Sequence, residues 1–590
     1  MKEFKQKSHF TTHNKRKTPC QDNKNKIEEI VNNIVNEKMS VKKNNKPTVA
    51  DFFCGAGGFS EGFNRSGFNV VFGLDNWKPA IETHDLNHPN CKSVLMNILD
   101  LDTPEKIDEV IPDTDIIVGS PPCVSFSNSN KSGKADKTLG IQLIEQYLKI
   151  ILHKKTKPGS KLKYWIMENV PNSIKFVKDV YTAKELGLDE SLPDLEVNNK
   201  HILTASDYGS PQGRKRAICG DYIVPEITHT KDNYVHVDKI MKSLGPPLNN
   251  NNSKIQDPSF ESIKLNKNEV TDHFYDGELP EDWWKKAKRL KQDHGYMGKM
   301  DFPDRTNRLC RTIMATESYC SRESIIFPKE GTNKYRAPTI RELGCLMGFP
   351  IDYQFTGNSS TTKHKQIGNA VCVHLSKALG DSIKKDMNIK LECEPREIKK
   401  MKFNLNDLKE PLFSKYKPKP KKINSKFHIH IPYLKLNQLR VELDNTKSNF
   451  DNEEFIWESI LHKGAGKNAK NTKMNTKDIE NMIKSHNKFT QVKKLVKENL
   501  EKKLFNSRVF QEKNCNIEND KDHYSPAQVL EMISHFIKNL DVSGDSIKNT
   551  ELDNTFQNKN EADYPIEIIF GFYITNKVCD FVSREKQIHK

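Results

Sequence analysis

The sequence predicts an open α/β fold built on a mostly parallel sheet, with further folded units added to it. Apolar runs at residues 49–53 and 70–74 alternate with helical patterns, and further strand-like runs follow at 93–98, 116–118 and 164–167. The first run leads into a glycine-rich stretch, and the fourth leads into a proline-stiffened loop. Strands that alternate with helices predict a parallel sheet whose reactive groups lie at the carboxyl ends of its strands.

The glycine-rich stretch at residues 54–60 is the first candidate ligand-binding element. Gly55 and Gly57 let the backbone approach a ligand closely at the N-terminus of the following helix. Asp75 ends the next strand about 20 residues later, where an acid commonly bonds a ribose diol; a helix N-cap is the alternative role. No Gly-Lys-Ser/Thr follows the glycines. The pattern therefore argues against a P-loop and favours a cofactor that carries adenosine.

The loop at residues 119–127 presents a single cysteine, Cys123, directly after Pro121 and Pro122. The two prolines fix φ and remove two N–H donors, so they stiffen the loop. A thiol on a stiff loop at the end of a parallel strand is placed for reaction with a ligand. The alternative is a buried structural cysteine, which is the commoner fate of a lone cysteine.

Polar residues at two further strand ends complete the candidate site. Glu168 and Asn169 end the apolar strand at residues 164–167, and the strand direction puts them at the same edge of the sheet as Cys123. A buried acid is costly without a partner, and here it could grip a polar ring or transfer a proton. Arg214 and Arg216 lie two residues apart at the mouth of another strand, which suits holding an anion or a base edge. A solvated basic turn is the alternative.

Composition limits the class of protein. The chain has 590 residues, of which 35% are hydrophobic and 29% charged, and this length predicts two to four domains. Its formal charge of +16 and pI of about 9.0 favour a polyanionic partner, although a bias toward Lys and Asn codons would produce the same charge. No apolar run approaches the roughly 20 residues of a membrane span. Twelve scattered cysteines without a CxxC pair favour a reducing, intracellular compartment and argue against a zinc cluster, so we expect no metal.

Several local elements can be predicted outside the main strands. Thr339 and Glu342 form a capping box for a helix that should run to Met347. One further helix is expected over residues 365–379 and a strand over residues 427–431. Residues 470–510 should form a charged helix.

Taken together and in this order, these stretches resemble the motifs of the cytosine-C5 DNA methyltransferase family. The resemblance covers about residues 47–385. It rests on six motifs: Asp51 to Gly58, Pro121-Pro122-Cys123, Glu168-Asn169-Val170, Gln212 to Arg216, Arg341 to Pro350, and Gly368-Asn369-Ala370-Val371. One departure is Val124, where many members carry Gln; it bears on contacts of the catalytic loop. Trp77 is one place away from the aromatic position that some members use against adenosine.

The resemblance implies a Rossmann-like S-adenosylmethionine-dependent methyltransferase sheet with a small inserted target-recognition domain. The residues expected to line the S-adenosylmethionine site are Phe53, Gly55, Gly57, Asp75, Asn97, Ile98 and Asn369. Cys123 would be the nucleophile, and Glu168, Arg214 and Arg216 would hold a flipped-out cytosine. Pro122 would line the base pocket, and Gln212 is a further expected substrate-binding residue.

The resemblance and the composition together suggest a division of the chain. The expected parts are a basic mobile arm (1–46), the first part of the catalytic domain (47–222), the target-recognition domain (223–334), the closing part of the catalytic domain (335–390), a basic linker (391–426) and a C-terminal module of unassigned role (427–590). The last of these would bind DNA or a partner, with a fused nuclease as the alternative.

The expected activity is methyl transfer to cytosine C5 in a specific duplex sequence, as in restriction–modification systems. An RNA-directed enzyme on the same fold, as in the family's tRNA-methylating branch, and a catalytically silent DNA-binding relative are the alternatives. We expect double-stranded DNA as the partner, a monomer on DNA, no membrane, and a cognate restriction endonuclease that acts on the same site. The expected location is the cytoplasm of a bacterium, at its nucleoid, or the interior of a virus-infected cell.

Overall fold

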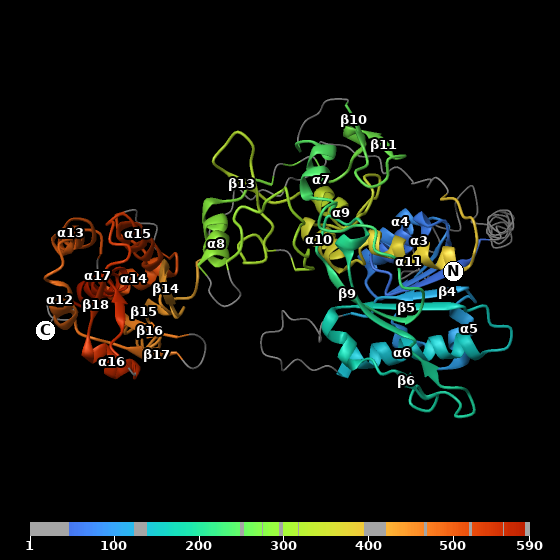
Figure 1. Ribbon diagram of the computed structural model, residues 1–590, viewed down its shortest axis with the longest axis horizontal. Helices are drawn as coiled ribbons and strands as arrows, with labels where there is room; N and C mark the ends of the chain where they lie inside the picture. The colour runs from blue at the N-terminus through green and yellow to red at the C-terminus, as the bar shows by residue number, and fades with distance from the viewer. Residues whose placement is uncertain are drawn as a thin grey trace, which may run out of the picture.

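The structure is a computed structural model in which three parts follow one another along the long axis (Figure 1). The first holds a large sheet, the second is rich in loops, and the third is formed by the C-terminal residues. The residues described are 46–122, 138–247, 253–273, 275, 277–293, 299–316, 318–393, 420–464, 469–504, 506–517, 522–558 and 560–584.

The large sheet has seven strands in the order β3-β2-β1-β4-β5-β9-β8. Strands β1 to β5 run parallel, β9 is antiparallel to β5, and β8 is antiparallel to β9. Their bounds are Thr48–Phe52 (β1), Asn69–Asp75 (β2), Lys92–Leu95 (β3), Ile116–Gly119 (β4), Tyr164–Asn169 (β5), Asn199–Thr204 (β8) and Lys215–Asp221 (β9). The predicted open, mostly parallel α/β sheet is thus confirmed. The predicted third strand is too long, because it ends at Leu95 and Ile98 already begins a short 3₁₀ helix.

Alternate residues of the central strands enter two different cores, one on each face of the sheet. Val49 and Ile116 pack with α3 (Gly58–Arg65) and α11 (Val373–Asp386), whereas Ala50 and Ile117 pack with α5 (Pro104–Val110) and α6 (Thr138–Thr156). Figure 1 shows these helix pairs above and below the sheet, with α4 (Lys78–Asn87) on the α3 side. Both faces are therefore buried, which explains why the strands are continuous apolar runs.

The closing part of this domain contains α9 (Ile340–Leu346), α10 (Ser360–Asn369) and α11. The predicted capping box is confirmed, because Thr339 accepts a hydrogen bond from the Glu342 backbone and the Glu342 side chain accepts one from Thr339 N. The single helix predicted over residues 365–379 is wrong, since Ala370 and Cys372 adopt extended backbone and separate α10 from α11. This break leaves the Ala370 carbonyl free to accept a hydrogen bond from elsewhere in the chain.

The middle part consists of short elements joined by long loops. These are α7 (Val237–Leu244), β10 (Lys254–Gln256), β11 (Lys264–Asn266), α8 (Glu281–Gln292), β12 (Phe327–Pro328) and β13 (Tyr335–Arg336). Much of its core is continuous with that of the α3 face of the sheet, since Val237, Ile240 and Ile313 belong to the same buried cluster as Val49. A separate small cluster includes Leu279, Ala287 and Ile326.

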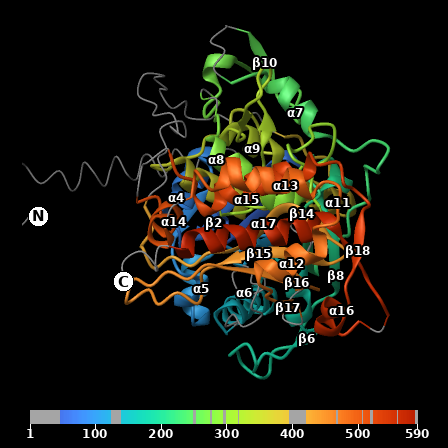
Figure 2. The ribbon, with the colours of Figure 1, turned by 90° about the vertical axis from the view of Figure 1, so that its left-hand side faces the viewer.

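The C-terminal unit has its own hydrophobic core around α17 (Ile566–Ser583), which crosses the unit in Figure 2. One face of α17 covers a four-stranded antiparallel sheet: β14 (His428–Leu436), β15 (Leu439–Asp444), β16 (Glu458–Lys463) and β17 (Lys470–Thr472). Shorter elements surround it: α12 (Thr476–Ile483), α13 (Phe489–Leu495), α14 (Ser507–Asn514), α15 (Pro526–Lys538), β18 (Ser546–Lys548), α16 (Thr550–Phe556) and β19 (Asp563–Pro565). The strand predicted at residues 427–431 is confirmed, but the single charged helix predicted over 470–510 is wrong.

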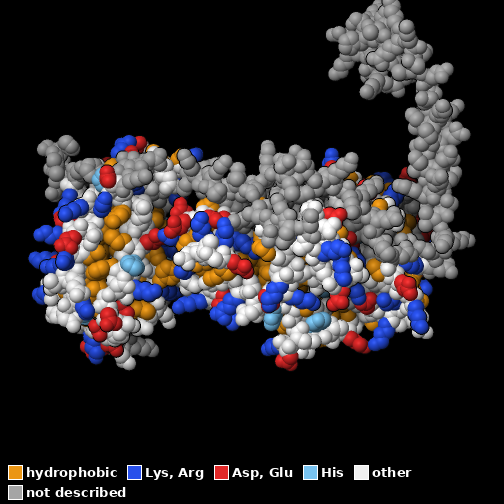
Figure 3. All heavy atoms as spheres, turned by 90° about the horizontal axis from the view of Figure 1, so that it is seen from above, with side chains coloured by type: hydrophobic (Ala, Val, Ile, Leu, Met, Phe, Trp, Pro, Cys, Tyr) orange, Lys and Arg blue, Asp and Glu red, His pale blue; other side chains and the backbone are white. Residues whose placement is uncertain are grey.

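A small polar joint connects the C-terminal unit to α8 of the middle part. Arg289 donates to the His430 carbonyl at 3.0 Å, and His430 Nε2 lies 3.0 Å from the buried Asp293 carboxylate. Lys and Arg side chains gather at the outer end of the C-terminal unit, at the left of Figure 3. In the α12–α13 region of the sequence, Lys484, Lys493, Lys494 and Lys497 are all exposed. The expected N-terminal arm and most of the expected basic linker lie outside the described residues.

No helix among the described segments is both long and apolar enough to cross a membrane.

Helices α3 and α11 pack so closely that a glycine is required between them. A Cβ on Gly62 would lie 2.3 Å from both Cβ and Oγ of Ser376. We therefore expect Gly62→Ala to lower the free energy of unfolding by about 1–3 kcal/mol through overpacking, as measured by urea denaturation. Gly213→Ala is the control, because its Cβ would meet only Leu309 Cδ1 at 4.0 Å and should change stability by less than about 0.5 kcal/mol. Equal effects of the two substitutions would contradict this packing argument.

Candidate functional site

The glycine-rich loop turns sharply at the carboxyl end of β1. Phe53, Gly55 and Gly57 all have positive φ, at 53°, 55° and 88°. Asp75 holds this loop against the end of β2, because one carboxylate oxygen accepts from Gly55 N at 3.0 Å and the other from Trp77 N at 2.8 Å. Burial raises the pKa of Asp75, and these backbone hydrogen bonds oppose that rise. Asp75 therefore shapes the loop, and its predicted bond to a ribose remains a prediction.

The other residues expected at the cofactor site differ in their burial and in how closely they approach the loop. Asn97 is exposed, and its side-chain oxygen accepts from Leu99 N at 3.2 Å. Ile98 is buried in the core on the α6 face. Asn369 is exposed at the end of α10, and the next turn of chain touches the loop directly, since a Cβ on Gly58 would lie 2.2 Å from the Val371 carbonyl. The structure thus brings the Asn369 segment to the glycine-rich loop.

The donor set and the free space at the loop fit a ligand that carries adenosine. A Cβ built on Gly55 would meet only the Phe53 carbonyl, at 3.9 Å, so the backbone is open to a ligand at this position. By contrast, Gly57 and Gly58 are packed tightly against the protein. The carboxylate of Asp75 and the exposed amide of Asn97 follow at the ends of β2 and β3. One open glycine beside polar groups at successive strand ends is typical of nucleotide sites in open α/β sheets.

The loop that carries the predicted nucleophile begins between this site and β5. Ser120 donates from its backbone to the Phe52 carbonyl at 3.1 Å and from its hydroxyl to the Phe53 carbonyl at 3.0 Å. Asn169 Nδ2 donates to the Pro121 carbonyl at 3.1 Å. Pro122 is exposed. Cys123 and Val124 lie outside the described residues, so the role of Cys123 remains a prediction.

Glu168 and Arg216 form a close ion pair at the same edge of the sheet. Arg216 Nε lies 2.7 Å from Glu168 Oε1, and their side chains are only 11% and 8% exposed. The pair arises because β9 is antiparallel to β5, so the start of β9 lies beside the end of β5. Two charges withdrawn from water at a strand edge stabilise each other. The contact is electrostatic, since Glu168 Oε1 has no hydrogen-bond partner among the described residues.

Arg214 and Gln212 do not lie at this pair but in the interior, where they join distant segments. Arg214 donates to the carbonyls of Ile313, Gly368 and Ala370 at 3.0–3.1 Å. Gln212 accepts from Ile313 N at 3.1 Å and donates to the sulfur of Met347 at 3.1 Å. Both side chains are buried. Their predicted contact with a substrate stays a prediction, whereas the bonds above make them joints between the sheet, the middle part and α10.

A buried polar chain under the glycine-rich loop was missed by the sequence reasoning. Ser60 donates from its backbone and its hydroxyl to Asp51 Oδ2, at 3.1 and 2.7 Å, and His84 Nε2 lies 2.9 Å from the Ser60 hydroxyl. Burial raises the pKa of Asp51 to about 7 and lowers that of His84 to about 4. His84 is therefore neutral near pH 7 and donates to Ser60. An acid inside an apolar strand was the available signal.

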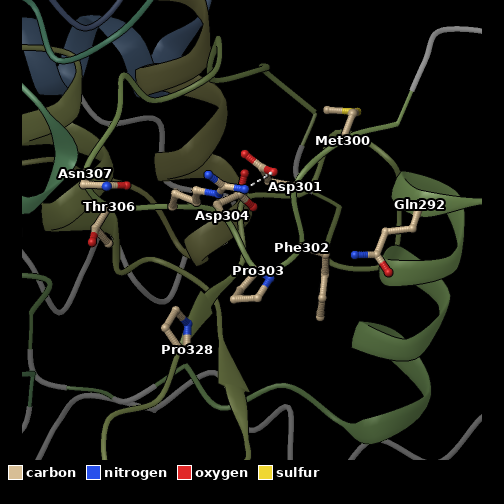
Figure 4. Close-up of a pocket in the computed structure, with 10 residues that line it drawn as sticks. Gln292, Met300, Asp301, Phe302, Pro303, Asp304, Thr306, Asn307 and Pro328 are labelled. Carbon is tan, nitrogen blue, oxygen red and sulfur yellow. Dashed lines mark ion pairs between the residues drawn. The ribbon is translucent and has the colours of Figure 1, made fainter.

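The middle part contains a hollow of about 470 Å³ beside the end of α8 (Figure 4). It is lined by Gln292, residues 300–307 and Pro328, and Gln292 points toward Phe302 in the figure. Asp304 fixes the loop of residues 301–309, because it accepts from Lys291 at 2.7 Å and from Ile326 N at 2.9 Å and also pairs with Arg311. These contacts anchor the loop to α8 and to the segment before β12.

This 301–309 loop presents two exposed arginines and leads to the segment that precedes β9. Arg305 and Arg308 each lie 3.1 Å from Asp301 and are 53% and 59% exposed. The next residue after the loop, Cys310, exchanges backbone hydrogen bonds with Pro211 and Gly213, at 2.7 and 3.1 Å. The loop thus ends beside the segment that carries Arg216.

An open sheet with a glycine-rich first turn, and an acid–arginine pair beside a proline-stiffened loop, place the protein in the class of Rossmann-like methyltransferases. The family model of the C-5 cytosine-specific DNA methylases matches residues 47–385. The chain belongs to this family, and it is a DNA cytosine-5 methyltransferase.

Curated relatives are similar to a little more than half of the chain. The type II methyltransferase M.MthTI of Methanothermobacter thermautotrophicus is 27% identical over 347 residues, which are 58% of this chain and 97% of the relative. M1.HphI of Haemophilus parahaemolyticus is 26% identical, over 57% of this chain and 87% of the relative. The solved structure of the methyltransferase EhMeth of Entamoeba histolytica matches 58% of this chain and 99% of its own, with 17% identity and a TM-score of 0.39.

The two arginines of the Gln-x-Arg-x-Arg motif should respond differently to substitution. Arg214→Ala removes three hydrogen bonds from buried carbonyls, so we expect it to lower the free energy of unfolding by about 3 kcal/mol. Arg216→Ala should cost less stability but lower the rate of DNA methylation about 100-fold, because the Glu168 carboxylate loses its partner. Urea denaturation and a methylation assay on the same preparations would measure both. A larger stability loss for Arg216→Ala than for Arg214→Ala would contradict the assignment.

Proposed function

We propose that the protein transfers a methyl group from S-adenosylmethionine to C5 of a cytosine flipped out of a specific duplex sequence, through a covalent bond between Cys123 and C6. The observation that carries this proposal is the Glu168–Arg216 pair, held 2.7 Å apart beside the proline-stiffened loop that leads to Cys123. An ion pair at the end of a buried strand is positioned to hold a polar ring against a nucleophile.

The residues proposed to hold the cofactor are Phe53, Gly55, Gly57, Asp75, Asn97, Ile98 and Asn369. Gly55 gives the close backbone approach, and Asp75 and Asn97 provide polar groups at the ends of β2 and β3. S-adenosylmethionine supplies an electrophilic methyl group when it is bound.

The proposed chemistry explains why this chain needs a thiol, an acid and a guanidinium at one edge. Cytosine C5 is a poor nucleophile, and addition of the Cys123 thiolate to C6 makes C5 enamine-like and able to attack a methyl group. The addition places negative charge on N3 and O2 of the ring. Glu168, sharing a proton with N3, offsets the first charge, and Arg216 at O2 offsets the second, each by a few kcal/mol. Arg214 supports Arg216 from the interior. The C5 proton must then leave to a base.

The base must leave the stack before it can react, at a cost of a few kcal/mol. The net charge of +16 favours phosphate contacts that offset this cost. We propose residues 223–334 as the target-recognition domain and the 301–309 loop as the part that reads bases, because its exposed arginines have the donor geometry that recognises guanine in the major groove. A monomer on DNA and a cognate restriction endonuclease are also proposed.

RNA methylation is the second candidate function, on the same chemistry. The loop-rich middle part favours DNA, since it offers an extra surface for reading a duplex. Methyl transfer compared between duplex DNA and tRNA separates the two.

The test of the covalent mechanism uses duplex DNA that carries 5-fluorocytosine, incubated with the full-length protein and S-adenosylmethionine. Fluorine at C5 cannot be removed as a proton, so the elimination that would break the bond between Cys123 and C6 is blocked. A stable protein–DNA adduct should therefore form. Cys123→Ser should form no adduct and show no methylation while it still binds S-adenosylhomocysteine. Cys393→Ser, at an exposed cysteine outside the site, is the control and should trap DNA normally. Normal methylation by Cys123→Ser would overturn the mechanism.

The recognition role of the 301–309 loop has its own test. Arg305→Ala and Arg308→Ala should relax the sequence preference at one base position each, by about 1–3 kcal/mol of discrimination, in bisulfite sequencing of methylated random duplexes. Lys242→Ala on α7 is the matched control, because Lys242 is also exposed and paired with an acid, Asp238, at 2.8 Å. Unchanged preference in both arginine variants would remove this loop from base recognition.

A further inference from the structure

The segment of residues 350–355 lies against the glycine-rich loop and contains a buried tyrosine, Tyr353. It follows α9 and is far from the loop in sequence. Tyr353 donates its hydroxyl hydrogen to the Ala56 carbonyl, which lies in the middle of the loop. Neither Tyr353 nor Ala56 is exposed to water. This hydrogen bond therefore joins the closing part of the domain to the proposed cofactor loop.

The Tyr353 hydroxyl also receives a hydrogen bond, and the donors can be followed from atom to atom. His88 Nε2 lies 3.1 Å from the Tyr353 hydroxyl oxygen, and Asn64 Nδ2 lies 2.9 Å from His88 Nδ1. Because the tyrosine hydrogen goes to Ala56, His88 must donate from Nε2, and its Nδ1 then accepts from Asn64. One neutral tautomer of His88 satisfies all three bonds, so the relay Asn64–His88–Tyr353–Ala56 has a single direction.

The glycine-rich loop packs directly against the Tyr353 and His88 side chains of this relay. A Cβ on Gly57 would lie 2.6 Å from the Tyr353 hydroxyl oxygen and 2.7 Å from His88 Nε2. Gly57 also has a φ of 88°, in the left-handed region. The side chains of Tyr353 and His88 therefore set the position of the loop at Gly57, whereas the backbone at Gly55 is open to a ligand.

The backbone of the same segment is held by Arg341 of α9 and by Asp257 of the middle part. Arg341 donates to the Tyr353 carbonyl and to the Thr271 hydroxyl and carbonyl, the latter two at 2.7 and 3.1 Å. Asp257 accepts from Ile351 N at 2.6 Å. Tyr353 is thus fixed in its backbone as well as in its side chain, so its hydroxyl has little freedom to move away from Ala56.

We propose that Tyr353 is a positioning residue for the methyl donor: it holds the glycine-rich loop, through Ala56 and with His88 behind it, in the shape that binds S-adenosylmethionine. This role rests on the proposed function. It concerns the geometry of the cofactor loop and not the reacting atoms, so its loss should weaken cofactor binding without changing the chemical step.

The test substitution is Tyr353→Phe, which removes only the hydroxyl oxygen. We expect the dissociation constant for S-adenosylhomocysteine, measured by titration calorimetry on the full-length protein, to rise roughly three- to tenfold. In methylation assays KM for S-adenosylmethionine should rise by a similar factor, while kcat at saturating cofactor stays within about twofold of wild type.

The chain offers a matched control in Tyr222. Its buried hydroxyl lies 3.2 Å from the Ile218 carbonyl and 3.2 Å from His201 Nδ1, which is the same tyrosine–histidine–carbonyl arrangement away from the loop. Tyr222→Phe should lower the melting temperature about as much as Tyr353→Phe and leave cofactor affinity unchanged. Unchanged affinity in Tyr353→Phe, or an equal loss in Tyr222→Phe, would overturn the positioning role.

A second pair of variants keeps the test decisive if Tyr353→Phe folds poorly. His88→Leu removes the donor behind Tyr353 and should weaken S-adenosylhomocysteine binding, whereas His88→Gln retains an N–H donor and should restore most of the affinity. Equal affinity of these two variants would overturn the relay. Wild-type protein that fails to bind S-adenosylhomocysteine would overturn the proposed function together with this role, and so would be distinguishable from a failure of Tyr353 alone.

Discussion

The structure depends on two buried guanidinium groups that hold distant segments of backbone together. Arg214 binds carbonyls that are 99 to 156 residues away in sequence, and Arg341 binds carbonyls on both sides of α9. A guanidinium has five N–H donors in a fixed plane and stays charged at any physiological pH, so each of these groups can satisfy several carbonyls at once. Without Arg214, the carbonyls of Gly368 and Ala370 at the α10–α11 break would lose these hydrogen bonds, at a cost in the free energy of unfolding.

These joints explain how an active edge can be assembled from residues spread over more than 300 positions. Arg214 places the start of β9, the middle part and the end of α10 at one point, and Arg216 then emerges beside Glu168. The acid–arginine pair is thus a consequence of the interior bonds as much as of the strand order. The motif Gln-x-Arg-x-Arg combines both functions: its first two polar members face the interior and its last faces the site.

Much of the fold could be predicted from the sequence, because β1, β2, β4 and β5 are continuous apolar runs with polar residues at their ends. The position of Glu168 at the edge that carries the Pro121–Pro122 loop followed from strand direction, whereas its pairing with Arg216 depends on β9 being antiparallel to β5. The division of labour between Arg214 and Arg216 could not be predicted, since both are the same residue type and only partners far away in sequence decide which is buried. The break at residues 370–372 depends on the same distant arginine. In residues 470–510, frequent lysines concealed apolar positions such as Ile479, Val492 and Leu500, which face the core around α17.

The joint between the C-terminal unit and the rest of the protein has a mechanical consequence. The described contacts are few and polar and lie at the end of α8, and interfaces of this kind allow relative motion by default. Because Arg289 lies in α8 and Asp293 directly follows it, movement of the C-terminal unit relative to the middle part would act on this helix. Lys291 of that helix donates a hydrogen bond to Asp304 in the 301–309 loop. Movement of the C-terminal unit would therefore be felt, through α8, at the loop of residues 301–309.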